Sequence, residues 1–231
     1  MRADGSEQTN LTENTFGDFS PAWSPDGTQI AFASQRAGDR YPNLYLINVD
    51  GTGLINLTDN RSEGEYPSWS PDGTQIAFAC YQGGGVRANT SPDYDICRIN
   101  RDGTGLQNLT NNPAYDFHPA WSPDGTQIAF MSERDGWPTL PNYTPLGYEA
   151  SRGGDREIYL MAADGSDPIN LTQFPREDDE MPTWSPEGWL LWSRYGCFMI
   201  MDPATLATAR VTHSSRCVGE DAGMFADWWW D

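Results

Sequence analysis

The chain has 231 residues, of which 38% are hydrophobic and 13% aromatic, with ten Trp, 23 Gly and 17 Pro. This apolar content suffices for a substantial core and excludes a disordered chain, and the length favours one all-β domain over two small domains. The formal net charge is −19, from 33 acidic and 14 basic residues. Such a charge disfavours nucleic acid and anionic lipid as partners and favours cations and basic protein surfaces.

The first element in chain order is incomplete. Residues 1–12 read MRADGSEQTNLT and align with a later stretch that ends at Thr172, so that Met1 falls on Met161. In the later copy this Met closes an alternating apolar run, which is typical of a β-strand. The chain therefore begins in the last residues of a predicted third strand, which a turn and a short fourth strand follow.

Three nearly identical units and one divergent unit come next. Each contains the motif WSPDG or WSPEG, and the Trp residues of this motif are Trp23, Trp69, Trp121 and Trp184. Pro and Gly in the motif are typical of a tight turn, and the TQIAF that follows in three units alternates with the period of a strand. An alternating third strand, a tight turn and a fourth strand that ends in LT or VT complete each unit.

Each unit is thus predicted to be a four-stranded antiparallel sheet of about 40 residues, and repeated sheets of this size are typical of a β-propeller. No helix is expected, because every apolar run is shorter than about eight residues and alternates. We predict a single domain over 1–231. Its four complete blades are expected at approximately 21–58, 67–110, 119–172 and 182–212.

The string WSPDG-x-x-IAF, followed by an IY-containing strand, a DG turn and an LT ending, resembles the TolB-type β-propeller repeat. The match is nearly full in three copies and loose in the fourth, and the units cover almost the whole chain. The resemblance implies a propeller in which strands from both termini commonly share one blade. It says little about function, because similar repeats occur in periplasmic Tol proteins, prolyl oligopeptidase-type propellers and many surface proteins.

A partial fifth blade is predicted from both ends of the chain. The C-terminal FADWWWD places Trp228 where a first-strand Trp stands, so residues 1–12 and 224–231 supply a fourth and a first strand. Three explanations of the missing strands stay open: the chain is a fragment, it closes a small ring with a thin blade, or another chain completes it. The last would include self-association through open strand edges.

One face of the predicted disc bears two long insertions, at 82–95 and 134–157. Tight turns occupy the opposite face, and binding usually resides in long loops on a rigid scaffold. Aromatic residues are enriched at protein interfaces, and the alternative is that these aromatics form a local core over the disc. The predicted partner-binding residues are Trp137, Tyr143, Tyr148, Tyr66 and Phe117.

Acidic residues are predicted on the same face, near the axis. Asp18, Asp116 and Asp179 each lie five residues before the Trp of their unit, on the innermost strand. Three carboxylates that converge on a channel mouth would hold Ca²⁺ together with carbonyl and water ligands. The alternative is that each Asp accepts backbone hydrogen bonds within its own loop.

The four cysteines lack CxxC spacing, so a zinc ribbon is not expected. Cys80 ends a second strand and Cys97 begins the next, while Cys197 aligns with Cys97 and Cys217 follows the fourth strand. We therefore predict the disulfides Cys80–Cys97 and Cys197–Cys217, with buried free thiols as the alternative. Disulfides indicate an oxidising compartment, so the expected location is periplasmic or extracellular. No run approaches 18 apolar residues, so membrane insertion is not expected.

No catalytic motif stands out. The only histidines are His118 and His213, and the chain contains no G-x-S-x-G stretch and no glycine-rich phosphate loop. We therefore predict a non-catalytic, exported binding propeller that engages a protein partner through its insertion-bearing face, with a cation in the channel as a further expectation. The alternatives are the propeller portion of a larger prolyl oligopeptidase-like hydrolase and a carbohydrate-binding propeller that uses Trp137 and Tyr148.

The tripeptide NLT occurs four times and fits the N-glycosylation pattern N-x-[ST]. Its asparagines are Asn10, Asn56, Asn108 and Asn170. Because the repeat itself generates these sites, a structural role for the asparagines is predicted instead of modification.

Overall fold

The computed structural model describes residues 6, 8–36, 38–39, 41–81, 94–135, 156–173 and 177–211. Within these ranges the chain forms sixteen β-strands and no helix. Accordingly, the described part of the chain contains no helix that is long and apolar enough to cross a membrane.

The strands form four separate sheets. The first sheet consists of β1 (Asp18–Trp23), β2 (Gln29–Ser34), β3 (Asn43–Asn48) and β4 (Ile55–Asn56). The second sheet consists of β5 (Glu65–Trp69), β6 (Gln75–Cys80), β7 (Asp95–Asn100) and β8 (Gln107–Asn108). The third sheet consists of β9 (Asp116–Trp121), β10 (Gln127–Ser132), β11 (Glu157–Ala162) and β12 (Ile169–Asn170). The fourth sheet consists of β13 (Asp179–Trp184), β14 (Leu190–Arg194), β15 (Cys197–Asp202) and β16 (Ala207–Arg210).

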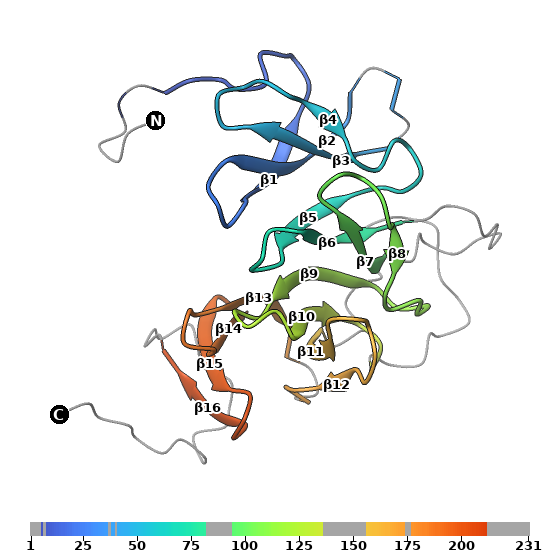
Figure 1. Cartoon of the computed structure of the whole chain (residues 1–231). Coiled ribbons are helices and arrows are strands. Elements are labelled where there is room, and N and C mark those ends of the chain that lie inside the picture. The colour runs from blue at the N-terminus through green and yellow to red at the C-terminus, as the bar shows by residue number, and fades with distance from the viewer. Residues whose placement is uncertain are drawn as a thin grey trace.

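Each sheet keeps its strands in sequence order, and all neighbours are antiparallel. The sheets follow one another around an arc, and the first strands β1, β5, β9 and β13 contact one another in turn (Figure 1). These are four consecutive propeller blades, so the predicted all-β propeller fold is confirmed. Each first strand begins two or three residues before its predicted start, because a bulge lengthens it.

The WSPDG motif folds as expected because its Asp accepts several hydrogen bonds. In the first blade, Asp26 Oδ1 accepts bonds from Ser24 Oγ at 2.7 Å and from the Thr28 backbone N–H at 3.0 Å. Gly27 supplies the positive φ of 68° that the turn requires. Hydrogen bonds from Ser24, Arg101 and Thr28 hold the pKa of Asp26 well below its usual range. The backbone turn of the hairpin is therefore formed by contacts within five consecutive residues, and Arg101 of the second blade adds one bond to Asp26.

The core lies between the blades instead of within one sheet. Leu44 and Leu46 of β3 pack against Ile76 and Phe78 of the next blade, and this arrangement recurs at the next two interfaces. The motif Trp of the following blade packs in or against the core at each of the three interfaces, as Trp69, Trp121 and Trp184. The indole N–H of Trp69 donates to the Ala22 carbonyl of the preceding blade at 3.1 Å, which fixes the register between the blades.

The first blade has a different environment on the side where a preceding blade would pack, here called its leading side. Trp23 is 62% exposed, whereas Trp69 and Trp121 are 7% and 8% exposed. Leu11 packs against the first blade, and a Cβ on Gly51 would lie 3.2 Å from the Leu11 carbonyl oxygen. Leu57 has the same relation to Gly103, at 3.5 Å. Leu11 thus lies where the fourth strand of a preceding blade would lie, although residues 8–12 form no strand; residues 224–231 are outside the described ranges.

The NLT tripeptide forms a turn in which its Asn side chain is an acceptor. Asn108 Oδ1 accepts hydrogen bonds from the backbone N–H groups of Thr110 at 3.1 Å and Asn111 at 2.9 Å. Thr110 Oγ1 in turn accepts a bond from the N–H of Ile96, at 3.0 Å. The residue after each NLT has a positive φ, as at Glu13 and Asn111. The side chain of Asn108 therefore has the structural role that the repeat predicts.

Candidate functional site

Every first strand contains a bulge next to its proline. The residue before this proline has a positive φ in all four blades, at Ser20 (51°), Tyr66 (53°), His118 (52°) and Met181 (56°). Such a conformation costs a non-glycine residue on the order of 1–3 kcal/mol and is concentrated at functional sites. A bulge also changes the direction of a side chain. The repeat thus gives each blade one redirected side chain, and its identity differs from blade to blade.

These bulges lie on the face formed by the connections between second and third strands and between successive blades, here called the insertion face. A continuous set of rings covers this face over the first three blades, here called the aromatic array. Its members are Tyr41, Tyr66, Tyr81, Tyr94, Tyr115, Phe117 and His118.

Tyr94 is the centre of the array. Its ring centroid lies 4.7 Å from that of Phe117, 6.2 Å from that of Tyr81 and 6.4 Å from that of Tyr115. Tyr66 connects the second blade to the third, since its ring lies 4.2 Å from that of His118. Tyr41 is exposed, and the other rings are partly buried. Each of these other rings is therefore partly packed against the protein and partly accessible to solvent.

Two carboxylates of the second blade lie beside the array. The Tyr94 hydroxyl donates a hydrogen bond of 2.5 Å to Glu63, a residue that is only 6% exposed. Burial raises the pKa of Glu63, and burial together with the charge of Glu63 raises the pKa of Glu65. Burial and the two glutamates raise the pKa of Tyr94 as well. In the described ranges, no Lys, Arg or His forms an ion pair with either glutamate.

The third and fourth blades have a charge-paired counterpart. Arg156 donates to Glu133 at 3.2 Å and also pairs with Glu180. His118 lies within the electrostatic reach of Glu180 and Arg156. Burial lowers the pKa of His118, the charge of Glu180 opposes this shift, and the charge of Arg156 adds to it. Because Glu133 and Glu180 share one arginine, this side of the insertion face already holds its own counter-ion.

The three aspartates predicted to bind Ca²⁺ are all ion-paired. Each pairs with an arginine of its own blade: Asp116 with Arg134 at 2.9 Å, Asp179 with Arg194 at 2.6 Å, and Asp18 with Arg36 at 3.5 Å. Within the described part of the chain, no three His, Cys, Asp or Glu side chains are grouped to hold a metal ion. The charge that a cation would balance is thus balanced by a guanidinium group in each of these blades, and the Ca²⁺ site stays a prediction.

Tyr66 and Phe117 both belong to the aromatic array, with their rings 6.2 Å apart. The other three predicted partner-binding residues, Trp137, Tyr143 and Tyr148, lie outside the described residues. The sequence-based prediction missed Glu63, Tyr81, Tyr94 and Tyr115. Tyr81 and Tyr94 closely flank the first insertion, and that position in the sequence is the signal that could have identified them.

A disulfide joins Cys80 at the end of β6 to Cys97 in β7, with a Cα–Cα distance of 5.7 Å. Cys97 is the third residue of its strand and lies opposite Phe78, so the bond crosses the ladder diagonally. Cys197 is also disulfide-bonded, and its predicted partner Cys217 lies outside the described residues. The Cys80–Cys97 bond closes the base of the first insertion, directly beside Tyr81.

Replacing Cys80 and Cys97 together with Ala is expected to lower the free energy of unfolding by about 3 kcal/mol. The loop that the bond closes has a sequence separation of 17 residues, and the chain-entropy cost of such a loop in the unfolded state is of this order. Urea unfolding of both proteins, with and without reducing agent, measures the difference. A reductant that destabilises the double variant as much as the parent would contradict this assignment.

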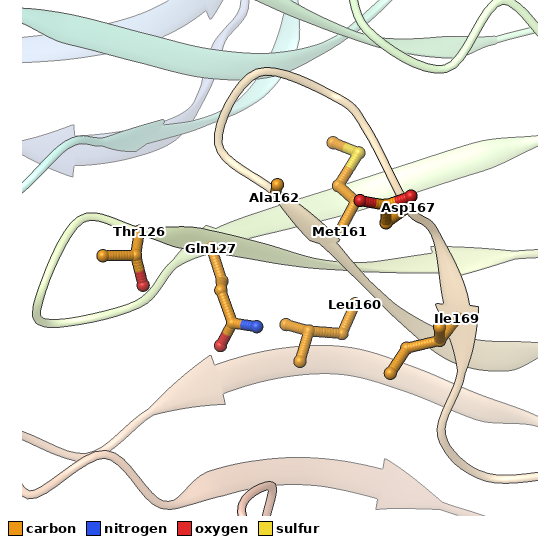
Figure 2. Close-up of a pocket in the computed structure, with 7 residues that line it drawn as sticks. All are labelled: Thr126, Gln127, Leu160, Met161, Ala162, Asp167 and Ile169. Carbon is orange, nitrogen blue, oxygen red and sulfur yellow. The ribbon is translucent and has the colours of Figure 1, made fainter.

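A hollow lies on the opposite face. It has a volume of about 360 Å³ and lies along the third blade, where Gln127, Met161 and Asp167 line it (Figure 2). Among the described residues that line it, Asp167 is the one ionisable group. The aromatic array is therefore the stronger candidate site.

The fold and this site define a β-propeller whose ring-covered face carries the candidate binding groups. The family described as TolB beta propeller domain matches residues 4–91. The chain is 32% identical over 140 residues to the "Protein TolB homolog" of Chlorobium luteolum, covering 59% of this chain and 29% of that protein. It is 35% identical over 116 residues to the "Tol-Pal system protein TolB" of Anaeromyxobacter dehalogenans, covering 39% of this chain and 26% of that protein.

The predicted resemblance to TolB-type propeller repeats is thus confirmed, and the chain spans less than a third of the length of these relatives. Among solved structures, TolB from Acinetobacter baumannii has a TM-score of 0.64 and 22% identity, covering 91% of this chain and 47% of that chain. An oligogalacturonate lyase from Vibrio parahaemolyticus has a TM-score of 0.58 and 18% identity, covering 87% and 54%. At these identities the two structures share the fold with this chain and carry no inference about activity.

Proposed function

We propose that this chain is a non-catalytic, exported binding propeller that engages a protein partner through its insertion face. The proposal rests on the aromatic array, a set of solvent-accessible rings that spans three blades. Large aromatic side chains dominate the energetics of protein interfaces, and Tyr is enriched among their hot spots.

The chemistry of the described residues supports binding over catalysis. His118, the histidine of the insertion face, has an Nδ1 atom that is buried without a hydrogen-bond partner among the described residues. Glu180, whose charge acts on His118, is paired with Arg156. General acid–base catalysis requires a proton-transferring pair within hydrogen-bond reach, and this pair of groups does not provide one. Relatives that are named as Tol-Pal system proteins also favour a role in protein assembly.

Export is supported by the Cys80–Cys97 disulfide. Disulfides persist in oxidising compartments such as the periplasm or the cell exterior and are rare in the cytosol. The net charge of −19 further favours a partner with a basic surface.

Site-specific photo-cross-linking in the source organism tests the proposal. p-Benzoylphenylalanine is placed at Phe117 and, separately, at Tyr41 on the insertion face, and at Trp189 in the β13–β14 turn on the opposite face. Tyr41 and Trp189 have matched exposures of 40% and 41%. We expect a discrete cross-linked protein from the two insertion-face positions and none from Trp189. Cross-links from Trp189 alone, or from none of the three positions, would overturn the proposal.

A further inference from the structure

The arginines of this chain show how its insertion face binds a guanidinium group. Arg134 follows β10, and its Cζ atom lies 4.6 Å from the ring centroid of Tyr159 and 5.1 Å from that of Phe130. The same guanidinium pairs with Asp116 at 2.9 Å. Arg36 repeats the arrangement in the first blade, over two rings and against one carboxylate. Cation–π attraction and a charge-assisted hydrogen bond thus act on one group.

The second blade differs at each position of this arrangement. Cys97 stands where the other two blades have Tyr45 and Tyr159. Gly64 stands where they have Asp18 and Asp116. Arg36 and Arg134 each stand thirteen residues after the motif Trp, and the corresponding residue after Trp69 is Gln82. Carboxylates are nevertheless present, because Glu63 and Glu65 lie at the start of this blade.

These glutamates are held in an environment that favours a positive neighbour. Both are removed from water to an extent that raises their pKa, and the charge of Glu63 adds to the effect on Glu65. Tyr94 connects them to the rings, since it donates to Glu63 and stacks near Phe117 and Tyr115. Burying two carboxylates together is costly unless a cation joins them.

We infer that Glu63, Glu65, Tyr94 and Phe117, here called the acidic–aromatic cluster, bind the guanidinium group of an arginine in a partner protein. A planar guanidinium stacks on aromatic rings and donates several hydrogen bonds to carboxylates, so it matches both components of the cluster. The inference rests on the proposed function, because it names the chemistry of the segment that the insertion face receives.

A metal ion is a poorer match than an organic cation. Ca²⁺ requires six to eight oxygen ligands, and among the described residues no three His, Cys, Asp or Glu side chains are grouped to hold a metal ion. A purely apolar side chain is a poorer match as well, because it would bury the two carboxylates without compensating their charge. An arginine can stack on the rings and donate hydrogen bonds to the carboxylates at the same time.

Titration with two short peptides tests the inference. The probes are acetyl-Gly-Gly-Arg-Gly-Gly-amide and the same peptide with citrulline, which keeps the shape of arginine without its charge. Binding to the full chain is followed by NMR through the aromatic ring protons, at millimolar peptide. We expect saturable shifts with the arginine peptide and an affinity at least about 10-fold weaker for citrulline, in line with the loss of charge-assisted bonds.

Matched variants locate the binding. E63Q/E65Q removes two charges from the cluster, and D167N/E187Q removes two exposed charges from the opposite face. We expect the first pair to weaken the arginine peptide about 10-fold and the second to change it less than 2-fold. F117L retains an apolar side chain but removes the ring, and it should weaken binding about 3-fold or more.

Three results would overturn the inference: equal binding of both peptides, equal effects of the two double variants, or arginine binding that appears only in R87Q. The last would show that Arg87 of the first insertion, which lies outside the described residues, is the natural occupant. If E63Q/E65Q does not fold, the comparison of arginine with citrulline in the parent chain still decides. If E63Q/E65Q leaves the cross-linking from Phe117 unchanged, the arginine inference is refuted and the proposed protein partner is retained. If the chain binds the arginine peptide but no position gives a cross-link, the arginine inference is retained and the proposed protein partner is refuted.

Discussion

Replacing Trp69 with Ala is expected to lower the free energy of unfolding by about 3–5 kcal/mol, whereas the same change at Trp23 costs less than about 1 kcal/mol. The two residues stand in the same motif and differ in their surroundings. Trp69 is 7% exposed and packs between two blades, and its indole N–H donates to the Ala22 carbonyl. Trp23 is 62% exposed, so its removal leaves no cavity.

Urea unfolding followed by far-UV circular dichroism measures both variants against the parent chain. The comparison is internally controlled, because both substitutions delete the same side chain from the same turn context. Equal destabilisation by W23A and W69A would mean that the leading side of the first blade is covered in solution. Leu11 already packs on that side, so a covering segment is expected to lie next to it.

The second large effect is expected at Asp179, where an Ala substitution should cost about 3 kcal/mol or more. Asp179 is fully buried, accepts a hydrogen bond of 2.8 Å from Trp192 Nε1 and binds Arg194 through two bonds of 2.7 and 2.6 Å. Removing the carboxylate deprives Arg194, whose side chain is 12% exposed, of one of the two acidic residues with which it forms ion pairs in the described ranges. Breaking one side of a buried ion pair typically costs 3–5 kcal/mol.

Asp18→Ala is the matched control for Asp179→Ala. Asp18 occupies the same place in the first blade, but its ion pair with Arg36 is longer, at 3.5 Å, and more exposed. The expected cost is less than about 1 kcal/mol, as for other surface pairs. Thermal unfolding with and without Ca²⁺ completes the test. A Ca²⁺-dependent stabilisation that both variants abolish would contradict the arginine pairing and support the predicted cation site.

The local rules of the repeat predicted much of the fold. The WSPDG hairpin, the alternating strands and the NLT turn each depend on contacts within a few residues, so their residue types suffice to predict them. The position of the disulfide followed from the same pattern, because Cys80 and Cys97 come from neighbouring strands of one blade. The array residues Tyr66 and Phe117 were predicted for a similar reason, since first-strand residues before the motif must lie on the insertion face.

Other features depend on contacts between residues that are far apart in the sequence, and rules about neighbouring residues do not predict such contacts. The residue before a proline favours an extended backbone with negative φ, yet Tyr66 and His118 have positive φ because a bulge adapts the first strand to its neighbour. The pairing of Asp116 with Arg134 was likewise missed, because the sequence does not show which guanidinium a buried carboxylate will meet.

The sequence by itself determined that this chain is a succession of four-stranded blades with tight turns on one face and insertions on the other. Tertiary structure alone decided which identical motifs are buried and which charges are balanced. Trp23 and Trp69 share the same turn, but within the described ranges only Trp69 has a preceding blade against it. Glu63 and Glu65 are ordinary acidic residues in the sequence, and their position beside Tyr94 makes them a candidate site. The physical reason is that desolvation and charge pairing depend on neighbours from distant parts of the chain.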